Sequence, residues 1–295
     1  MKEIKKVGVL GCGLMGSGIA QVCAEAGYET IVREVEQRFI DNGFKKIEGF
    51  WKKNVEKGKA TPESVAAAKS KLIGITDLSR LKDCDLVIDA LPEELAIKKE
   101  VFKALDGIVS SSTIIASNTS SLSVTEMATF VSNPQRFIGM HFFNPVPVMK
   151  LVEVAKTIVT AQENLDAAFS FVKSLGKVDI AAKDNCGFIV NLLLIPYVFD
   201  AISMFEKGHA SIEDIDKAMR FGAGYPMGPF ALTDLVGLDT AYKIGNIMYE
   251  ENKEARYAPP GLLKKMVLMG YYGMKTGKGF YDYSQTPPKP TALNF

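Results

Sequence analysis

Two short apolar runs of this chain end in polar side chains of the kinds that act on substrates. One run, residues 114–117, leads to Asn118 and Ser120, and the other leads to His141 and Asn144. A buried strand does not need such polar residues for its stability. Imidazole is the usual general base at neutral pH, and hydroxyl or amide groups can stabilise an oxygen that gains negative charge. The pattern therefore predicts a site where His141 moves a proton while nearby polar groups hold the reacting oxygen.

A glycine-rich turn near the N-terminus predicts a dinucleotide site. Gly11, Gly13 and Gly16 form the pattern G-x-G-x-x-G between a β-rich run and a helix-favouring run, with Leu14 and Met15 inside it. Such glycines permit a tight turn and let the backbone approach a pyrophosphate. The N-terminus of the following helix supplies N–H groups for the phosphates. Taken alone, the pattern also fits an ordinary turn between a strand and a helix.

The acidic residue that should accompany such a turn is Glu34, which follows Gly16 by 18 residues at the end of a second β-rich run. A carboxylate there can accept hydrogen bonds from both hydroxyls of a ribose. It would repel a 2′-phosphate, which favours NAD over NADP. Arg33 stands next to it, however, and a guanidinium could bind that phosphate. We therefore expect NAD, with NADP as the alternative.

The order of the runs predicts two domains, which suits a chain of 295 residues. Strand-like and helix-like runs alternate through residues 1–186, and this predicts an α/β, Rossmann-type domain with a mainly parallel sheet that binds NAD(P). Within it, the lysine-rich segment of about residues 35–72 should form a helical arm of two helices. Residues 187–295 should form an all-helical domain for substrate binding and dimerisation, with a loose proline-rich tail from Gln285.

Composition narrows the classes of partner. The formal net charge is +1, so no global field would attract nucleic acid or an anionic membrane. Four scattered cysteines and two histidines favour neither a metal site nor a disulfide framework. No run is typical of a signal peptide or a membrane span. We expect a cytoplasmic protein, and the broad apolar faces of its C-terminal helices predict a homodimer.

Five motifs together resemble the L-3-hydroxyacyl-CoA dehydrogenase family. They are GCGLMGSG, ASNTSSL, GMHFFNPVPVMKLVEV, GPFALTDLVGLD and KTGKGFYDY, and the likeness extends from Lys5 to Tyr283. It is strongest to the bacterial short-chain members that act on 3-hydroxybutyryl-CoA. The resemblance implies an NAD(P)-dependent oxidoreductase of butanoate and fatty acid metabolism. Its acyl-CoA substrate would be 3-hydroxybutyryl-CoA, which is interconverted with acetoacetyl-CoA.

The resemblance also implies roles for single residues. The catalytic pair would be His141 and Glu153, which are twelve residues apart, while Ser120 and Asn191 would position the substrate. Besides the glycine loop and Glu34, the residues implied in cofactor binding are Glu93, Lys98, Asn118 and Asn144.

Less specific interpretations stay open for several of these residues. Ser120 could cap the helix that is expected near Ser123, and Asn191 could bond to its own helix backbone. His209 is expected at a helix C-terminus, where it would interact with the helix dipole.

The lysines of the arm also allow two interpretations. Lys52 and Lys57, with Lys53 and Lys59 beside them, could bind the phosphates of coenzyme A or could form a solvated helix face. For the whole chain, the alternatives are a dehydrogenase of a hydroxy acid without coenzyme A and a non-catalytic dinucleotide-binding module.

Overall fold

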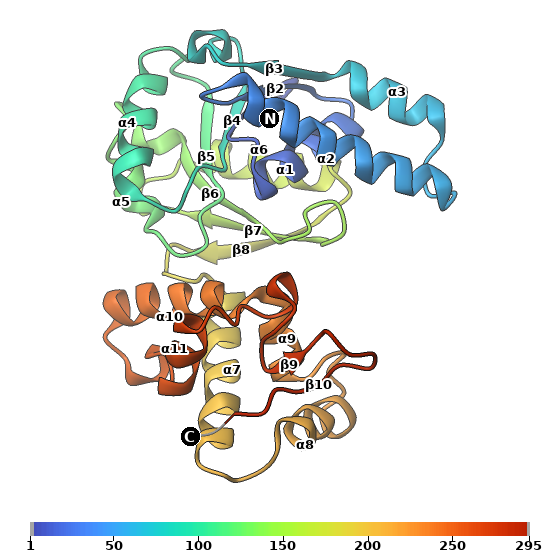
Figure 1. Cartoon of the computed structure of the whole chain (residues 1–295). Helices are drawn as coiled ribbons and strands as arrows, with labels where there is room; N and C mark the ends of the chain where they lie inside the picture. The colour runs from blue at the N-terminus through green and yellow to red at the C-terminus, as the bar shows by residue number, and fades with distance from the viewer. Residues whose placement is uncertain (1–2, 294–295) are drawn as a thin grey trace. The chain divides into compact units, whose positions relative to one another are not determined.

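The computed structural model describes residues 3–293. The chain folds into two compact units that divide between Asn185 and Cys186, and Figure 1 shows the elements of each. In the part of the chain described, no helix is long and apolar enough to cross a membrane.

The first unit is built around an eight-stranded sheet with the order β3-β2-β1-β4-β5-β6-β7-β8. The strands are β1 (Lys6–Leu10), β2 (Glu29–Arg33), β3 (Leu72–Ile75), β4 (Leu86–Asp89), β5 (Ile114–Ser117), β6 (Phe137–Phe142), β7 (Leu151–Lys156) and β8 (Val178–Lys183). The first six run parallel, β7 is antiparallel to β6, and β8 is parallel to β7. This arrangement confirms the predicted mainly parallel sheet.

Helices cover both faces of the sheet. They are α1 (Leu14–Glu25), α2 (Gln37–Glu56), α3 (Pro62–Ser70), α4 (Leu95–Asp106), α5 (Val124–Ala128) and α6 (Gln162–Ser174), with short 3₁₀ turns η1 (Leu78–Leu81) and η2 (Pro134–Arg136). Because side chains alternate along a strand, Val7 and Val9 of β1 join one core with α1 and α6. On the other face, the ring of Phe102 in α4 packs edge-on against Phe137 in β6, with 5.0 Å between centroids.

The predicted arm is present as α2 and α3, which extend away from the sheet at the right of Figure 1. The chain leaves α2 through Gly58, whose φ of +67° suits glycine. Thr61 then caps α3 by accepting from the backbone of Ser64, and Pro62 occupies the first turn. The predicted bounds overlap β3 only at Leu72, but the strand itself, at residues 72–75, is not among the predicted elements. A four-residue edge strand that contains glycine has too weak a pattern to predict.

One face of α2 lies against the glycine-rich turn. A methyl group added at Gly43 would lie 2.1 Å from Sγ and 2.6 Å from the carbonyl oxygen of Cys12. Further along the helix, the indole Nε1 of Trp51 donates to Oε1 of Glu25 in α1 at 2.7 Å. Residue size at position 43 therefore decides how closely α2 supports the turn.

The second unit is mainly helical. Its elements are α7 (Val190–Glu206), α8 (Ile212–Lys217), a π-helical turn η3 (Ala218–Gly222), α9 (Pro229–Val236), α10 (Leu238–Asn252), η4 (Ala255–Tyr257), α11 (Gly261–Leu268), η5 (Met274–Thr276), β9 (Tyr281–Asp282) and β10 (Lys289–Pro290). Gly237, with a φ of +100°, separates α9 from α10, so residues 229–252 form two helices.

The last segment of this unit corrects two predictions. The unit is not all-helical, because β9 and β10 form a short antiparallel hairpin. The tail is not loose as far as Thr291, whose backbone N–H donates to the carbonyl of Phe280 at 2.8 Å and whose hydroxyl donates to that of Gly279 at 2.7 Å. These contacts are non-local, so a proline-rich composition alone does not reveal them. The last two residues of the predicted tail lie outside the described residues.

Gly43 and Gly49 offer a matched test within α2. Gly43→Ala should lower the free energy of unfolding by about 1–3 kcal/mol, because the methyl group overpacks against Cys12. Gly49 has open space around its Cβ position, so Gly49→Ala should raise it by about 0.5–1 kcal/mol through helix propensity. Urea unfolding of both variants measures the difference. Equal effects would show that α2 does not rest on the turn.

Candidate active site

The polar residues predicted for the site follow the carboxyl ends of adjacent strands. Gly11 follows β1, Asp89 ends β4, Asn118 follows β5, and His141 lies near the end of β6. These strands are neighbours in the sheet and run parallel. In open α/β sheets, ligands bind outside this edge, where the strand order reverses.

The glycine-rich turn has the shape that a dinucleotide requires. Gly11 has a φ of +92°, and a methyl group at Gly16 would lie 2.0 Å from the carbonyl oxygen of Gly11. A methyl group at Gly13 would meet nothing within 4 Å, and Leu14 is 63% exposed. The turn is therefore closed at its ends and open in the middle. No side chain caps α1 at Gly13, so the first N–H groups of the helix suit a phosphate.

The acidic partner of this turn lies beside it. Oε1 of Glu34 accepts from the backbone of Cys12 at 2.6 Å, and Oε2 accepts from that of Val35 at 3.2 Å. Nε of Arg33 donates instead to the carbonyl of Thr76 at 3.3 Å. The guanidinium is thus engaged with the segment after β3, which favours NAD over NADP. The residues of the turn and Glu34 together fit the adenosine and pyrophosphate parts of NAD.

The thiol of Cys12 lies at the base of the same turn. Burial, and then the negative charge of Glu34, raise the pKa of Cys12 to about 12. The thiol is therefore neutral at physiological pH and adds no negative charge below the position expected for the phosphates.

His141 and Glu153 form a buried pair because of strand register. In the antiparallel pairing of β6 with β7 they stand directly opposite each other. Nδ1 of His141 and Oε2 of Glu153 are 2.7 Å apart, and the residues are 6% and 0% exposed. With its proton on Nδ1, the ring donates to the carboxylate and Nε2 can accept a proton from a substrate.

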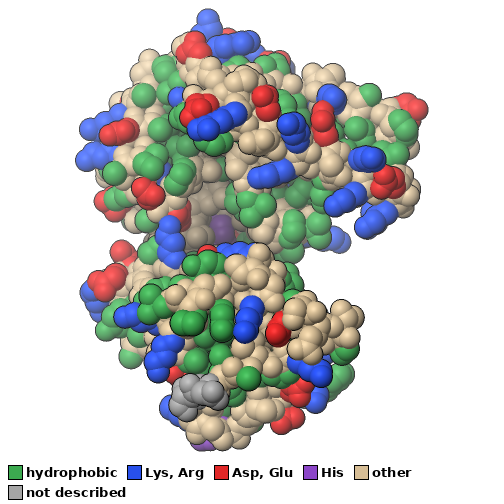
Figure 2. Space-filling model, viewed as in Figure 1, with side chains coloured by type: hydrophobic (Ala, Val, Ile, Leu, Met, Phe, Trp, Pro, Cys, Tyr) green, Lys and Arg blue, Asp and Glu red, His purple; other side chains and the backbone are tan. Residues whose placement is uncertain are grey.

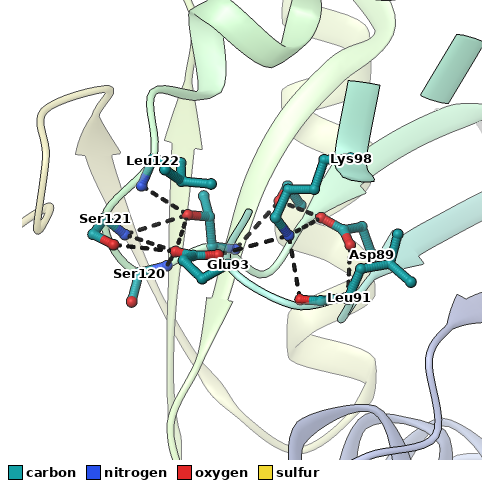
Figure 3. Close-up of polar contacts among 9 residues, drawn as sticks. Asp89, Leu91, Glu93, Lys98, Ser120, Ser121 and Leu122 are labelled. Carbon is teal, nitrogen blue, oxygen red and sulfur yellow. Dashed lines mark hydrogen bonds and ion pairs between the residues drawn. The ribbon is translucent and has the colours of Figure 1, made fainter. Parts of the chain in front are cut away.

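Ser120 lies in a turn that Glu93 holds, as Figure 3 shows. Oε1 of Glu93 accepts from the Thr119 hydroxyl at 2.5 Å, the Ser120 backbone at 3.0 Å, and the backbone and hydroxyl of Ser121, each at 3.2 Å. The hydroxyl of Ser120 points away from Glu93 in Figure 3. Ser123 is the residue that caps α5, by accepting from Glu126 at 3.1 Å. The cap interpretation of Ser120 is therefore wrong.

Lys98 lies beneath this turn, between two carboxylates. Its Nζ is 2.6 Å from Oδ2 of Asp89 and 3.6 Å from Oε2 of Glu93, and its side chain is 1% exposed. Oδ2 of Asp89 also accepts from the hydroxyl of Ser117 at 2.6 Å. The buried ammonium offsets one of the two negative charges. Contacts of Glu93 and Lys98 with the cofactor stay a prediction.

The two asparagines differ in their surroundings. Oδ1 of Asn118 accepts from the backbone of Phe142 at 2.8 Å, which ties the start of the turn to β6 beside His141. Asn144 is exposed in the loop after β6. Nζ of Lys177 donates to the carbonyls of Val146 and Met149 in this loop, at 2.7 and 2.8 Å. Sequence reasoning missed Lys177, because nothing local marks a lysine that bonds to a loop 31 residues earlier.

The remaining predicted residues lie elsewhere. Asn191 belongs to the second unit, near the start of α7, and is 8% exposed. Among the hydrogen bonds of the described residues, its side chain makes none to its own helix. Lys52 is exposed on α2 and Lys57 is exposed directly after it, and Figure 2 shows basic side chains over the arm. Their substrate contacts stay predictions.

Gly13 and Gly16 should respond differently to alanine. Gly13→Ala should leave unfolding unchanged but weaken NADH binding about tenfold or more, because its methyl group points into open space beside the expected phosphates. Gly16→Ala should lower both the thermal stability and the affinity for NADH, because the methyl group would clash with the carbonyl oxygen of Gly11. Calorimetric titration with NADH and thermal unfolding separate the two effects. Unchanged affinity in Gly13→Ala would contradict a phosphate site at this turn.

Both units match a family model. Residues 6–185 match the model described as 3-hydroxyacyl-CoA dehydrogenase, NAD binding domain. Residues 187–283 match the model described as 3-hydroxyacyl-CoA dehydrogenase, C-terminal domain.

Individual proteins are similar along nearly the whole chain. The chain is 45% identical over 282 residues to 3-hydroxybutyryl-CoA dehydrogenase of Mycobacterium tuberculosis, covering 95% of this chain and 99% of that protein. It is 46% identical over 287 residues to human mitochondrial hydroxyacyl-coenzyme A dehydrogenase, covering 95% and 91%. The structure of (S)-3-hydroxybutyryl-CoA dehydrogenase from Ralstonia eutropha is 40% identical, with a TM-score of 0.92 and coverage of 96% and 100%. The chain belongs to the 3-hydroxyacyl-CoA dehydrogenase family.

Proposed function

We propose that this chain interconverts (S)-3-hydroxybutyryl-CoA and acetoacetyl-CoA with NAD as its cofactor. The observation that carries the proposal is the buried pair of His141 and Glu153, at the same edge of the sheet as the glycine-rich turn. An imidazole oriented by a carboxylate suits removal of a proton from a secondary alcohol. The names of similar proteins support 3-hydroxybutyryl-CoA as the substrate.

Residues of the chain itself accept and return the proton that is transferred in the reaction. Bound NAD would supply the acceptor for the hydride that leaves C3 of the substrate. His141 takes the proton of the C3 hydroxyl on Nε2 and becomes an imidazolium. Glu153, at 2.7 Å from Nδ1, stabilises that positive charge and holds the ring in one orientation. In the reverse direction, His141 returns the proton to the oxygen of acetoacetyl-CoA.

Two further groups would hold the reacting oxygen. The hydroxyl of Ser120 points away from Glu93 in Figure 3, so it can donate to a ligand. Asn191, from the second unit, would donate its amide to the same oxygen. Loss of one such donor typically costs about 10²–10³ in rate.

The arm would bind the phosphates of coenzyme A. Lys52 of α2 and Lys57 directly after it are exposed, whereas Lys69 of α3 pairs with Glu48 at 2.7 Å. Among the ion pairs of the described residues, none involves Lys52 or Lys57, and exposed ammonium groups attract phosphate at low cost.

The proposal includes a homodimer, formed through the helices of the second unit, in the cytoplasm. Large apolar side chains on that unit are exposed, which is typical of a surface that another chain covers. They include Leu193, Met204, Phe221, Leu268 and Met269.

The oxidation of NADH by acetoacetyl-CoA, followed by absorbance, tests the reaction. The wild type should oxidise NADH faster than NADPH, and His141→Ala should lower kcat by about 10²–10⁴ because it removes the general base. His209→Ala is the matched control, since His209 is exposed and follows the end of α7.

Each other outcome has a separate meaning. A wild-type protein that binds NADH but does not act on acetoacetyl-CoA would contradict the proposed substrate and favour a hydroxy acid without coenzyme A. Full activity in His141→Ala would leave the reaction in place but remove His141 as its base.

Light scattering on the full chain tests the dimer. We expect twice the mass of one chain, and Phe221→Asp should shift the equilibrium toward the monomer because it places a charge in an apolar interface. Phe221 is 78% exposed. Ile158→Asp, which changes an 88% exposed residue of the first unit, should leave the mass unchanged. A monomeric wild type would contradict the proposal.

A further inference from the structure

A second carboxylate binds the chain just after the turn that carries Ser120, at the start of α5. Oδ1 of Asp184 accepts from the backbone of Val124 at 2.8 Å, and Oδ2 accepts from that of Thr125 at 2.6 Å. The hydroxyl of Ser123 donates to Oδ2 at 3.3 Å. Glu93 accepts hydrogen bonds from residues 119–121. The two carboxylates therefore bind the chain on either side of Leu122.

Asp184 reaches the turn from a distant part of the chain. Asp184 directly follows β8. Strand β8 pairs in parallel with β7, and Ile180 of β8 stands beside Glu153 of β7. The carboxylate therefore connects the strand next to that of Glu153 with a turn 60 residues earlier. At the start of the turn, Asn118 bonds to Phe142, the neighbour of His141. One connection therefore leads to β8, the neighbour of the strand that carries Glu153, and the other leads to β6, which carries His141.

Ser120 itself depends on this support. Its backbone N–H is bonded to Glu93, but in the described part of the chain its hydroxyl makes no hydrogen bond that would fix it. The position of that hydroxyl is therefore set by the backbone of the turn. Hydrogen bonds from N–H groups to a carboxylate are among the stronger ones in proteins, and a site must hold its groups within about 0.5 Å to be productive.

We propose that Asp184 is a positioning residue, which places the hydroxyl of Ser120 relative to His141. The inference rests on the proposed function, in which Ser120 donates to the reacting oxygen. A merely structural role is also available, because Val124 and Thr125 are the first two residues of α5 and Asp184 therefore accepts from N–H groups of its first turn. A capping role alone would not make the effect of an Asp184 substitution depend on the Ser120 hydroxyl.

Asp184→Asn tests the proposal with little change in shape. One oxygen remains to accept from Val124, while the new amide group faces the N–H of Thr125 and cannot accept from it. We expect kcat/KM for acetoacetyl-CoA to fall about 10–100-fold, with KM for NADH changed less than about twofold. Asp179→Asn is the control, because Asp179 in β8 forms only a 3.8 Å ion pair with Lys173.

A double-mutant cycle with Ser120→Ala separates positioning from stability. If Asp184 acts through Ser120, Asp184→Asn should cost less than about threefold in kcat/KM once the Ser120 hydroxyl is absent. The same full loss in both backgrounds would overturn the proposal, and so would wild-type kinetics in Asp184→Asn. Asp184→Glu, which keeps the charge, should recover part of the activity and serves as the second variant if Asp184→Asn does not fold.

Hydrogen exchange gives a readout that does not require turnover. Backbone amides of residues 120–125 should exchange faster in Asp184→Asn than in the wild type and in Asp179→Asn. If the wild type does not reduce acetoacetyl-CoA, the proposed function fails while this comparison still tests the support of the turn. Unchanged exchange would overturn the role of Asp184.

Discussion

The antiparallel pairing of β6 with β7 is the constraint on which the site depends. It places Glu153 directly opposite His141, with 2.7 Å between Oε2 and Nδ1. A carboxylate that is 0% exposed is costly unless a partner compensates for its lost hydration. The imidazole supplies that compensation, and the carboxylate in turn orients the imidazole. A slip of one residue in this register would turn one of the two side chains to the opposite face of the sheet.

The net charge of +1 creates no strong field over the whole chain. Around this pair, charged side chains instead order the site through local contacts. Glu34 organises the glycine-rich turn through Cys12, and Glu93 and Asp184 organise the turn of Ser120. Lys98 forms ion pairs with both Asp89 and Glu93 and offsets one of their two negative charges. Glu34 and Glu93 accept from backbone N–H groups of segments that have no regular secondary structure, and Asp184 accepts from the first N–H groups of α5. The irregular parts of the site are therefore ordered by side chains, and the sheet supplies the points of attachment.

Patterns with a short range in sequence predicted most of the fold, because hydrophobic periodicity, glycine turns and helix caps are local. The resemblance of HFFNP and LVEV identified the pair that β6 and β7 bring together. What sequence reasoning missed depends on tertiary contacts: the edge strand β3, the pairing of the C-terminal hairpin, and the bonds of Asp184 and Lys177 to distant loops. The cap at Ser123 did have a local signal, a Ser followed three residues later by Glu126.

The surroundings of Cys12 bear on how the cofactor turn withstands oxidants. Only a thiolate reacts readily with peroxide, and a thiol with a pKa of about 12 is almost never ionised in a cell. Its sulfur also lies where a methyl group on Gly43 would be only 2.1 Å away, so the closely packed α2 leaves little room for added oxygen atoms. Both features disfavour oxidation of the cysteine in the middle of the G-x-G motif, which protects the cofactor turn from peroxide.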